Sequence, residues 1–238
     1  MSVAPRSNEF GQPIGPELPD WRPPPRPQQR RLEGRFCTVE PIDVDRHARD
    51  LYAANSLDRE GRMWTYLFSG PYASFDEYAG WLAERAPSRD PLFQAFVSNE
   101  SGRAVGLGSF MRIEPAAGSI EVGHIAMSPL LQRSPAATEA MYLMMRHAFE
   151  LGYRRYEWKC DSLNEKSRRA AERLGFTYEG LFRQAIVYKG RSRDTAWYSI
   201  IDREWPRVRE AFEHWLDPGN FDADGRQRRG LAEIRATL

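Results

Sequence analysis

The chain has 238 residues, of which 41% are hydrophobic and 28% charged, and its formal net charge is +1 at pH 7. This length suits one domain with a sizeable core, and the composition is that of a globular protein in water. A charge so close to zero gives no sign of a nucleic-acid or membrane partner. No apolar run approaches the ~20 residues of a membrane span, and the polar N-terminus lacks a signal-peptide core. We therefore expect a cytoplasmic protein.

The cysteines and histidines predict neither a disulfide nor a metal site. Cys37 and Cys160 are far apart in the sequence and lie in strand-like segments, so we expect two buried free thiols. The four histidines are scattered, and their spacing is not that of metal ligands. The sequence thus implies no metal.

Proline dominates the first part of the chain, residues 1–31, which holds eight prolines. Because proline removes amide donors and blocks helix formation, we expect an extended N-terminal arm without a core of its own. A globular domain is expected over residues 32–205, followed by a C-terminal helix and polar tail over 206–238. Four apolar residues would let the arm lie across the domain surface: Phe10, Ile14, Leu18 and Trp21.

Hydrophobic periodicity, turn residues and helix caps predict the elements of the globular part. In chain order they are strand 36–40, helix 43–55, helix 74–85, strands 93–98, 104–113 and 119–127, helix 136–151, strand 155–160, helix 164–174, strands 181–189 and 194–201, and helix 207–215. Runs of neighbouring strands with interspersed helices indicate a mixed sheet covered by helices.

The turn before the helix at 136–151 is rich in small residues, which let backbone amides approach an anion closely. The first turn of a helix offers free N–H groups and the positive end of the helix dipole, so a phosphate would bind well there. Arg133 would add positive charge. On these residues alone, an ordinary helix start is the alternative.

This segment resembles the cofactor-binding core of the GNAT superfamily, whose turn reads Gln/Arg-x-x-Gly-x-Gly/Ala. Gln132 takes the first place and Ala137 the last, whereas Pro135 replaces the middle glycine. Proline there removes one amide donor and stiffens the turn. The stretch Asn164–Phe176 resembles the second GNAT signature.

Three flanking stretches resemble the Rim-type branch of that superfamily, which includes N-terminal acetyltransferases of ribosomal proteins. They are Glu121–His124, Glu179–Arg183 and Asp194–Thr195. The resemblance extends from about residue 32 to residue 205. It implies a mixed, mostly antiparallel α/β (α+β) sheet of about seven strands flanked by helices, with a V-shaped splay between the fourth and fifth strands.

The resemblance also implies an acyltransferase that passes the acetyl group of acetyl-coenzyme A to a primary amine by direct attack on the thioester. The amine would belong to a protein N-terminus or to a small molecule. A homodimer is common in the superfamily. The residues implied to hold coenzyme A, beside Ser167, are Ile125, Ala126, Met127, Gln132, Arg133, Ser134, Ala136, Ala137, Thr138 and Asn164.

Acetyl transfer needs a base for the amine, and two residues of one predicted strand are candidates. Glu121 corresponds to a carboxylate position of Rim-type enzymes that takes the proton directly or through water. His124 is the rival, because histidine titrates near neutral pH. Strict alternation places the two side chains on opposite faces, and a bulge would alter this. The alternatives are a salt-bridged strand residue and a packed histidine.

The leaving thiolate needs an acid. Many GNAT enzymes carry a tyrosine where this chain has Ala171, so Ser167, which matches a serine of Rim-type relatives, is the candidate acid. The alternative for Ser167 is a first-turn serine that bonds the helix backbone. Asn164 is expected to cap the helix and contact the pantetheine arm.

Aromatic residues between the first two helices are candidates for acceptor binding, because aromatic rings hold amines and flat groups well. Their alternative is packing of these helices onto the sheet. The candidate acceptor residues, beside Glu121, are Trp64, Tyr66, Arg183 and Tyr198. Two other functions are left open: a coenzyme-A-binding sensor with little turnover, and an interaction module that uses the proline-rich arm.

Overall fold

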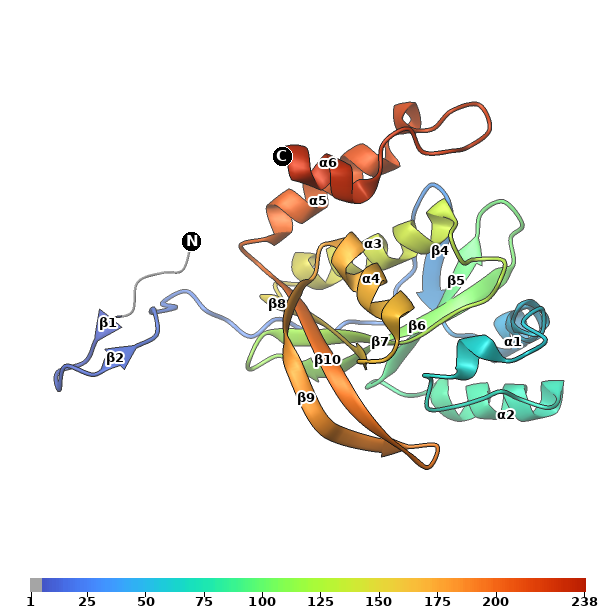
Figure 1. Cartoon of the computed structure of the whole chain (residues 1–238), viewed down its shortest axis with the longest axis horizontal. Helices are drawn as coiled ribbons and strands as arrows, with labels where there is room; N and C mark the ends of the chain where they lie inside the picture. Colours follow the sequence, from blue (N-terminus) through green and yellow to red (C-terminus); the bar gives the residue numbers. More distant parts are fainter. Residues whose placement is uncertain (1–5) are drawn as a thin grey trace.

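The computed structural model describes residues 6–238. Figure 1 shows a central twisted sheet with helices on both faces and an N-terminal arm that extends away from it. The elements are β1 (Arg6–Ser7), β2 (Pro13–Ile14), β3 (Leu32–Glu33), β4 (Cys37–Pro41), α1 (Val44–Asn55), η1 (Arg62–Trp64), α2 (Phe75–Arg85), β5 (Leu92–Ser98), β6 (Ala104–Glu114), β7 (Ser119–Met127), α3 (Pro135–Glu150), β8 (Arg155–Asp161), α4 (Glu165–Leu174), β9 (Thr177–Tyr188), β10 (Arg191–Ile201), α5 (Trp205–Leu216), η2 (Pro218–Asn220) and α6 (Leu231–Thr237).

The central sheet has the strand order β3-β4-β5-β6-β7-β8-β10-β9. Neighbouring strands are antiparallel except β7 and β8, which are parallel and joined through α3. This confirms the predicted mixed, mostly antiparallel fold. The sheet has eight strands rather than about seven, because the short β3 pairs with β4 through residues that carry no alternating pattern long enough to read.

Two hydrophobic cores lie on opposite faces of the sheet. Residues of α1, η1 and α2 pack against one face, here called the α1/α2 face. Residues of α3, α4, α5 and α6 pack against the other, the α3/α4 face. The two sets of helices are separated by the sheet in Figure 1.

The pairing of β7 with β8 covers only the first part of both strands. Residues 119–122 pair with residues 155–158, whereas β7 continues to Met127 and β8 to Asp161. The strands therefore separate after Val122 and Trp158. This confirms the predicted splay, since these are the fourth and fifth predicted strands.

Local caps explain where the central helices begin. The Ser134 side chain accepts a hydrogen bond from the Ala137 amide at the start of α3, and Pro135 takes the first helical position. That position has no intrahelical partner for its N–H, so proline costs nothing there. Asn164 accepts from the Ser167 amide and caps α4, as predicted.

The segment expected to be a polar tail contains a helix. Leu231 and Ile234 of α6 are buried against the α3/α4-face core, and the Arg235 guanidinium donates to the carbonyl oxygens of Glu172 and Arg173 at the end of α4. The helix was missed because α6 spans only seven residues, too few for a clear helical period.

The N-terminal arm contacts the domain from Trp21 onward, and Arg26 donates to the Ile113 carbonyl at 3.1 Å. The Trp21 ring lies against Gly118 and under the Arg154 guanidinium, 5.7 Å from ring centre to Cζ. Phe10 is 77% exposed, and the β1–β2 hairpin projects away from the domain in Figure 1. Surface packing of the arm was therefore predicted correctly for Trp21 but not for the apolar residues before it.

Both cysteines are buried free thiols, as predicted. No helix within residues 6–238 combines the length and the apolar character needed to cross a membrane.

Candidate active site

A β-bulge at His124 brings the two candidate bases to the same face of β7. Residue pairing with β6 shifts register between Gly123 and Ala126, and His124 has φ of 50°. The His124 ring contacts Phe93 with 4.9 Å between ring centres, and its Nδ1 lies 2.8 Å from Ser109 Oγ. Both partners line the α1/α2 face, because Phe93 belongs to its core and is paired with Ser109.

Glu121 lies on the same α1/α2 face. It pairs with Met111 of β6, and Met111 lies two positions along the strand from Ser109, on the same side. Strict alternation predicted opposite faces for Glu121 and His124. That expectation is corrected by the bulge, which inserts one extra residue and re-aims the histidine.

Glu121 belongs to an ionic cluster, buried at its centre, whose members come from the four strands β7, β8, β9 and β10; it is here called the Lys159 cluster. Lys159 Nζ lies 2.8 Å from Glu121 Oε2 and 2.7 Å from Glu157 Oε2. The same ammonium lies 3.8 Å from the centre of the Trp197 ring. Arg155 forms two ion pairs: its guanidinium lies 2.6 Å from a carboxylate oxygen of Glu157 and 2.5 Å from one of Glu179 on β9. Because the Lys159 and Glu121 side chains are each only 6% exposed, water screens this cluster little.

The environment separates the pKa values of these groups. Burial raises the pKa of Glu121, against the opposing effect of Lys159 and Arg112. Burial acts the same way on Glu157, but hydrogen bonds from Lys159 and Arg155 outweigh it and lower that pKa. Burial, with the charges of Arg85 and Arg112, lowers the pKa of His124 to about 4. His124 is therefore neutral at physiological pH, and Glu121 is the carboxylate with the stronger tendency to take a proton.

The separation of β7 and β8 leaves the β8-facing edge of β7 without a strand partner from Gly123 onward. The predicted thioester-binding residues, Ile125 to Met127, lie on this edge. Ile125 and Met127 pack against the α3/α4-face core, and Ala126 is buried in the other core. Their backbone therefore borders the gap between the two faces.

The turn that follows β7 is suited to an anion. Gln132 donates from Nε2 to the Met127 carbonyl at 2.8 Å, which closes the turn, and Arg133 adopts φ of 60°. The amides of Ala136 and Thr138 donate to no atom of residues 6–238 outside α3. Thr138 Oγ1 accepts a hydrogen bond from Arg173 of α4 at 2.8 Å. Free amides and a nearby guanidinium at a helix N-terminus fit the pyrophosphate of coenzyme A.

Ser167 lies on the α3/α4 side of the gap. Its Oγ accepts a hydrogen bond from Trp158 Nε1 at 3.0 Å, and Trp158 is the last β8 residue paired with β7. The hydroxyl is therefore oriented by β8 and not by the helix backbone, which was the alternative interpretation. Ala171 is fully buried, so no acid replaces the tyrosine of other GNAT enzymes at that position.

The aromatic loop, residues 64–70, contacts the β8–α4 loop and the β9–β10 hairpin. Tyr66 donates its hydroxyl to the Leu163 carbonyl at 3.1 Å. Lys189 donates to three carbonyls of the loop, those of Trp64, Ser69 and Gly70. Trp64 itself is buried and packs edge-on against Tyr72, which matches the packing alternative. Phe68, 53% exposed, is the loop ring open to solvent.

Tyr198 does not join the residues around Glu121. It is fully buried on the α3/α4 face, where its hydroxyl bonds Arg168 and Glu172 of α4. Trp197, its neighbour in sequence, points to the Lys159 cluster instead. The sequence-based placement of Tyr198 chose the wrong one of two alternating positions.

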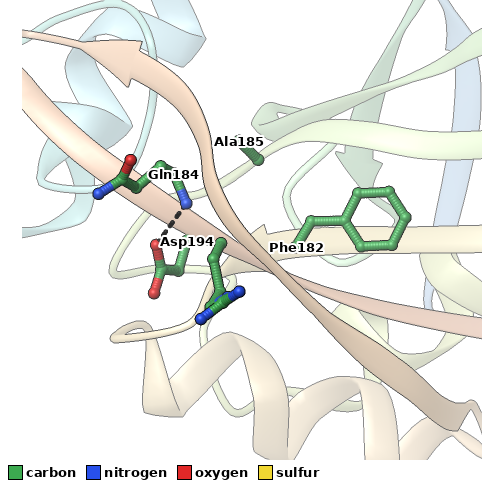
Figure 2. Close-up of a pocket in the computed structure, with 5 residues that line it drawn as sticks. Phe182, Gln184, Ala185 and Asp194 are labelled. Atoms are coloured by element: carbon green, nitrogen blue, oxygen red, sulfur yellow. Dashed lines mark hydrogen bonds between the residues drawn. The ribbon is translucent and has the colours of Figure 1, made fainter.

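Arg183 lines an open hollow of about 810 Å³ on the outer hairpin, with Phe182, Gln184, Ala185 and Asp194 (Figure 2). The Gln184 amide donates to Asp194 Oδ1 at 2.7 Å, and Figure 2 shows Phe182 pointing away from both. The Phe182 ring instead stacks on Trp197 at 4.4 Å. The structure thus places Arg183 apart from the Lys159 cluster, and its acceptor role stays a prediction.

Sequence reasoning missed the residues of β8 that complete the site. Arg155, Glu157, Lys159 and Asp161 alternate with apolar residues and share one face. Such alternation is normally a solvent-facing pattern, and nothing local signals that Lys159 is buried between Glu121 of β7 and Trp197 of β10. Within residues 6–238, no group of acidic, histidine and cysteine side chains is placed to hold a metal ion.

The region that carries these features is similar to known acetyltransferases. A family model described as acetyltransferase (GNAT) domain matches residues 38–177, more than half of the chain. A crystal structure of a GCN5-related N-acetyltransferase from Brucella melitensis is 47% identical, with a TM-score of 0.90 over 92% of this chain and 100% of that one. A provisionally assigned GNAT acetyltransferase from Chromobacterium violaceum ATCC 12472 is 38% identical, with a TM-score of 0.76 over 82% of this chain and 98% of that one.

A shorter match is found with a Bacillus subtilis (strain 168) protein, YdaF, provisionally named a ribosomal N-acetyltransferase. It is 45% identical over 42 residues, which are 18% of this chain and 23% of that protein. The matched part is therefore less than a quarter of this relative.

Proposed function

The chain belongs to the GNAT family of acetyl-coenzyme-A-dependent N-acetyltransferases, and from this premise we propose that Glu121 and Ser167 serve acetyl transfer to a primary amine from opposite faces of the β7–β8 gap. The observation that supports this most is their placement. Glu121 lies on the α1/α2 face, at the closed end of the gap, whereas Ser167 lies on the α3/α4 face, bonded to Trp158.

The reaction has two proton transfers, and each has its own side chain on one of the two faces of the sheet. The amine nitrogen forms a bond to the thioester carbonyl carbon, and the carbon–sulfur bond breaks. The amine proton passes to Glu121, directly or through water, and the thiolate sulfur takes a proton from the Ser167 hydroxyl; Ser167 then regains a proton from water and Glu121 releases one to water. Base and acid act on opposite sides of one carbon, so each needs access from its own side. Backbone amides of residues 125–127, beside the gap, stabilise the charge that develops on the carbonyl oxygen.

Glu121 is preferred to His124 as the base. A group accepts a proton from an amine more readily when its own pKa lies closer to the working pH, and burial raises the pKa of Glu121 while it lowers that of His124. His124 remains a catalytic candidate that holds the bulge through Ser109.

The coenzyme is held by the turn after β7 and the first turns of α3 and α4. Free amides at Ala136 and Thr138, with Arg133 beside them, take the pyrophosphate. Asn164 bonds the pantetheine arm in addition to capping α4. When bound, acetyl-coenzyme A supplies the activated acyl group, and these residues only position it.

The acceptor class to test first is a protein N-terminus, because the short match to YdaF carries a ribosomal name. Trp64, Tyr66 and Phe68 border the side from which the amine arrives.

Two further proposals concern the location and the oligomeric state of the protein. The two unpaired thiols favour a cytoplasmic location, and the second proposal is a homodimer formed through β9. That strand is an unpaired edge of the sheet with exposed Tyr178, Leu181 and Val187, and such edges pair readily with another chain. Sedimentation of the purified protein would test the dimer.

Coenzyme A release from acetyl-coenzyme A over a panel of amines and N-terminal peptides tests the activity, beside a thermal-shift titration with coenzyme A. We expect stabilisation by coenzyme A and amine-dependent release. Stabilisation without transfer to any amine would replace the enzyme by a coenzyme-A sensor. The absence of both would contradict the proposal and favour an interaction module.

A further inference from the structure

Arg193 on β10 is a buried arginine without a carboxylate partner. It is 6% exposed. Its Nε donates to Thr195 Oγ1 at 3.1 Å, and its guanidinium carbon lies 5.5 Å from the centre of the Phe68 ring and 5.8 Å from that of Tyr188. In the described part of the chain, no carboxylate oxygen lies within 4.0 Å of its nitrogen atoms. Burying a charge without a partner is costly, so such residues are rarely kept without a counter-charge.

Two carboxylates next to Arg193 in the sheet or in sequence are engaged elsewhere. Asp161 accepts from the Tyr188 hydroxyl at 2.7 Å and from the Leu163 amide at 2.9 Å. Asp194, although adjacent in sequence, accepts from the Gln184 amide on the outer hollow. The Arg193 guanidinium therefore keeps donors that no protein acceptor uses.

Two more cationic side chains, Lys189 and Arg191, belong to the same hairpin as Arg193, and they too are hydrogen-bonded to neutral groups. Lys189 Nζ donates to carbonyls of the aromatic loop, to that of Gly70 at 2.7 Å. Arg191 donates to the Thr65 carbonyl at 2.6 Å and lies 5.1 Å from the Tyr188 ring centre. Carbonyls and rings orient these cations without neutralising their charge. The end of the hairpin thus carries concentrated positive potential beside Phe68.

Arg193 lies on the same face of the sheet as the Lys159 cluster. Thr195 and Trp197 follow it at alternate positions of β10, and Trp197 lies under Lys159. On the sheet, β10 is separated from β7 by β8 alone. Arg193 lies two residues beyond Thr195, which pairs with Asp161 past the last β7–β8 pair, so it is at the open end of the gap. A group bound by Arg193 would therefore lie across the open end of the β7–β8 gap from β7, on the α1/α2 face.

We propose that Arg193 binds a carboxylate of the acceptor, so that the preferred acceptors are amines that also carry a carboxylate, such as amino acids or peptides with an acidic residue next to the N-terminus. This inference rests on the proposed function. A guanidinium offers paired donors that match a carboxylate, and the flanking rings of Phe68 and Tyr188 keep water from competing. Thr195 orients the guanidinium through Nε and leaves its two terminal nitrogens for the ligand.

Matched acceptor pairs that differ only by a carboxylate and a carboxamide test this. One arm compares free amino acids with their amides, and a second compares tetrapeptides with Asp or Asn at the second position. The wild-type protein should show a kcat/KM for the acid member of at least one arm roughly 10- to 100-fold above that of its amide. The arm with the larger ratio tells whether free amino acids or peptides supply the carboxylate.

The variant Arg193→Gln should reduce that ratio to within about threefold by raising the KM of the acid member, with the kcat for the neutral member retained. Arg103→Gln, at an exposed arginine of the β5–β6 turn, controls for the loss of one positive charge and should leave the ratio unchanged. Coenzyme A affinity and the thermal midpoint report whether the variant is folded.

The wild-type ratios remain decisive even if Arg193→Gln fails to fold. Transfer to amines with equal kcat/KM for both members of every pair would overturn the carboxylate proposal and leave the acetyltransferase intact. A preference that survives Arg193→Gln would assign it to another residue and equally overturn the proposal. No transfer to any amine would instead refute the proposed function.

Discussion

The Lys159 ammonium sits between Glu121 and Glu157, 2.8 Å from an oxygen of the first and 2.7 Å from an oxygen of the second. One cation is thus shared by two buried carboxylates. It holds the pKa of Glu157 low, while the pKa of Glu121 stays raised because burial outweighs the attraction. We regard Lys159 as a positioning residue that sets how readily Glu121 takes a proton.

The variant Lys159→Gln tests this relationship. Glu121 acts as a base only when ionised, so activity falls as the pH drops through its pKa. Loss of the ammonium removes the main influence that lowers this pKa, and it leaves Glu121 beside a second carboxylate. The rising limb of kcat/KM should move up by about one pH unit or more. Lys159→Arg, which keeps the charge, should shift it less. Equal profiles for the wild type and Lys159→Gln would show that Glu121 is not the titrating base.

Glu121→Gln and His124→Gln separate the two candidate bases. We expect Glu121→Gln to lower kcat by roughly 10²- to 10⁴-fold, the usual contribution of a general base. His124→Gln should cost far less, because burial lowers the pKa of His124 to about 4 and so weakens the imidazole as a proton acceptor, whereas burial raises the pKa of Glu121. Rate profiles of both variants from pH 4 to pH 9 decide the matter, since the amine ionises identically in each. A larger loss in His124→Gln would reverse the assignment.

Ser167→Ala tests the acid on the opposite face. The hydroxyl receives the Trp158 indole N–H at 3.0 Å, which orients its own proton away from β8. Because protonation of a leaving group contributes roughly 10²-fold or more, kcat should fall by about that factor while the Kd of coenzyme A changes less than about threefold. Trp158→Phe removes only the orienting donor and should cause a smaller fall. A Ser167→Ala enzyme with unchanged kcat would reduce this serine to a first-turn residue of α4.

The sequence predicted most of the elements because their signals are local. Ser134 and Asn164 cap α3 and α4 as side-chain chemistry requires, and simple alternation along β7 holds from Ile120 to Val122. The site itself depends on non-local geometry. The bulge at His124 has no residue signature, and Lys159 meets Glu121 only because parallel pairing aligns Glu121 with Glu157, two residues before Lys159. Arg193 could not be identified as unpaired until its neighbours' partners were known.

Glu139 provides a test of stability that leaves the chemistry aside. This buried α3 carboxylate accepts hydrogen bonds from the amides of Arg35, Phe36 and Cys37 at 2.7, 2.6 and 2.8 Å, so it fastens α3 to the strand β4. A neutral amide keeps one acceptor oxygen but turns an N–H₂ group toward backbone donors. We therefore expect Glu139→Gln to lower the free energy of unfolding by roughly 2–4 kcal/mol, measured by denaturant titration.

The matched control for Glu139→Gln is Glu150→Gln on the same helix, whose carboxylate is 59% exposed and 3.6 Å from Arg146 Nε. An exposed pair of this kind contributes little, so the loss should stay below about 0.5 kcal/mol. Both variants should bind coenzyme A with unchanged affinity below their unfolding transitions, because neither side chain reaches the first turn of α3 or the gap. Equal stability losses in the two variants would show that the three hydrogen bonds from backbone amides to Glu139 add no more stability than an exposed ion pair does. A loss confined to Glu139→Gln would show that this contact between α3 and the start of β4, and not the charge of the helix, secures the sheet edge to the coenzyme-binding helix.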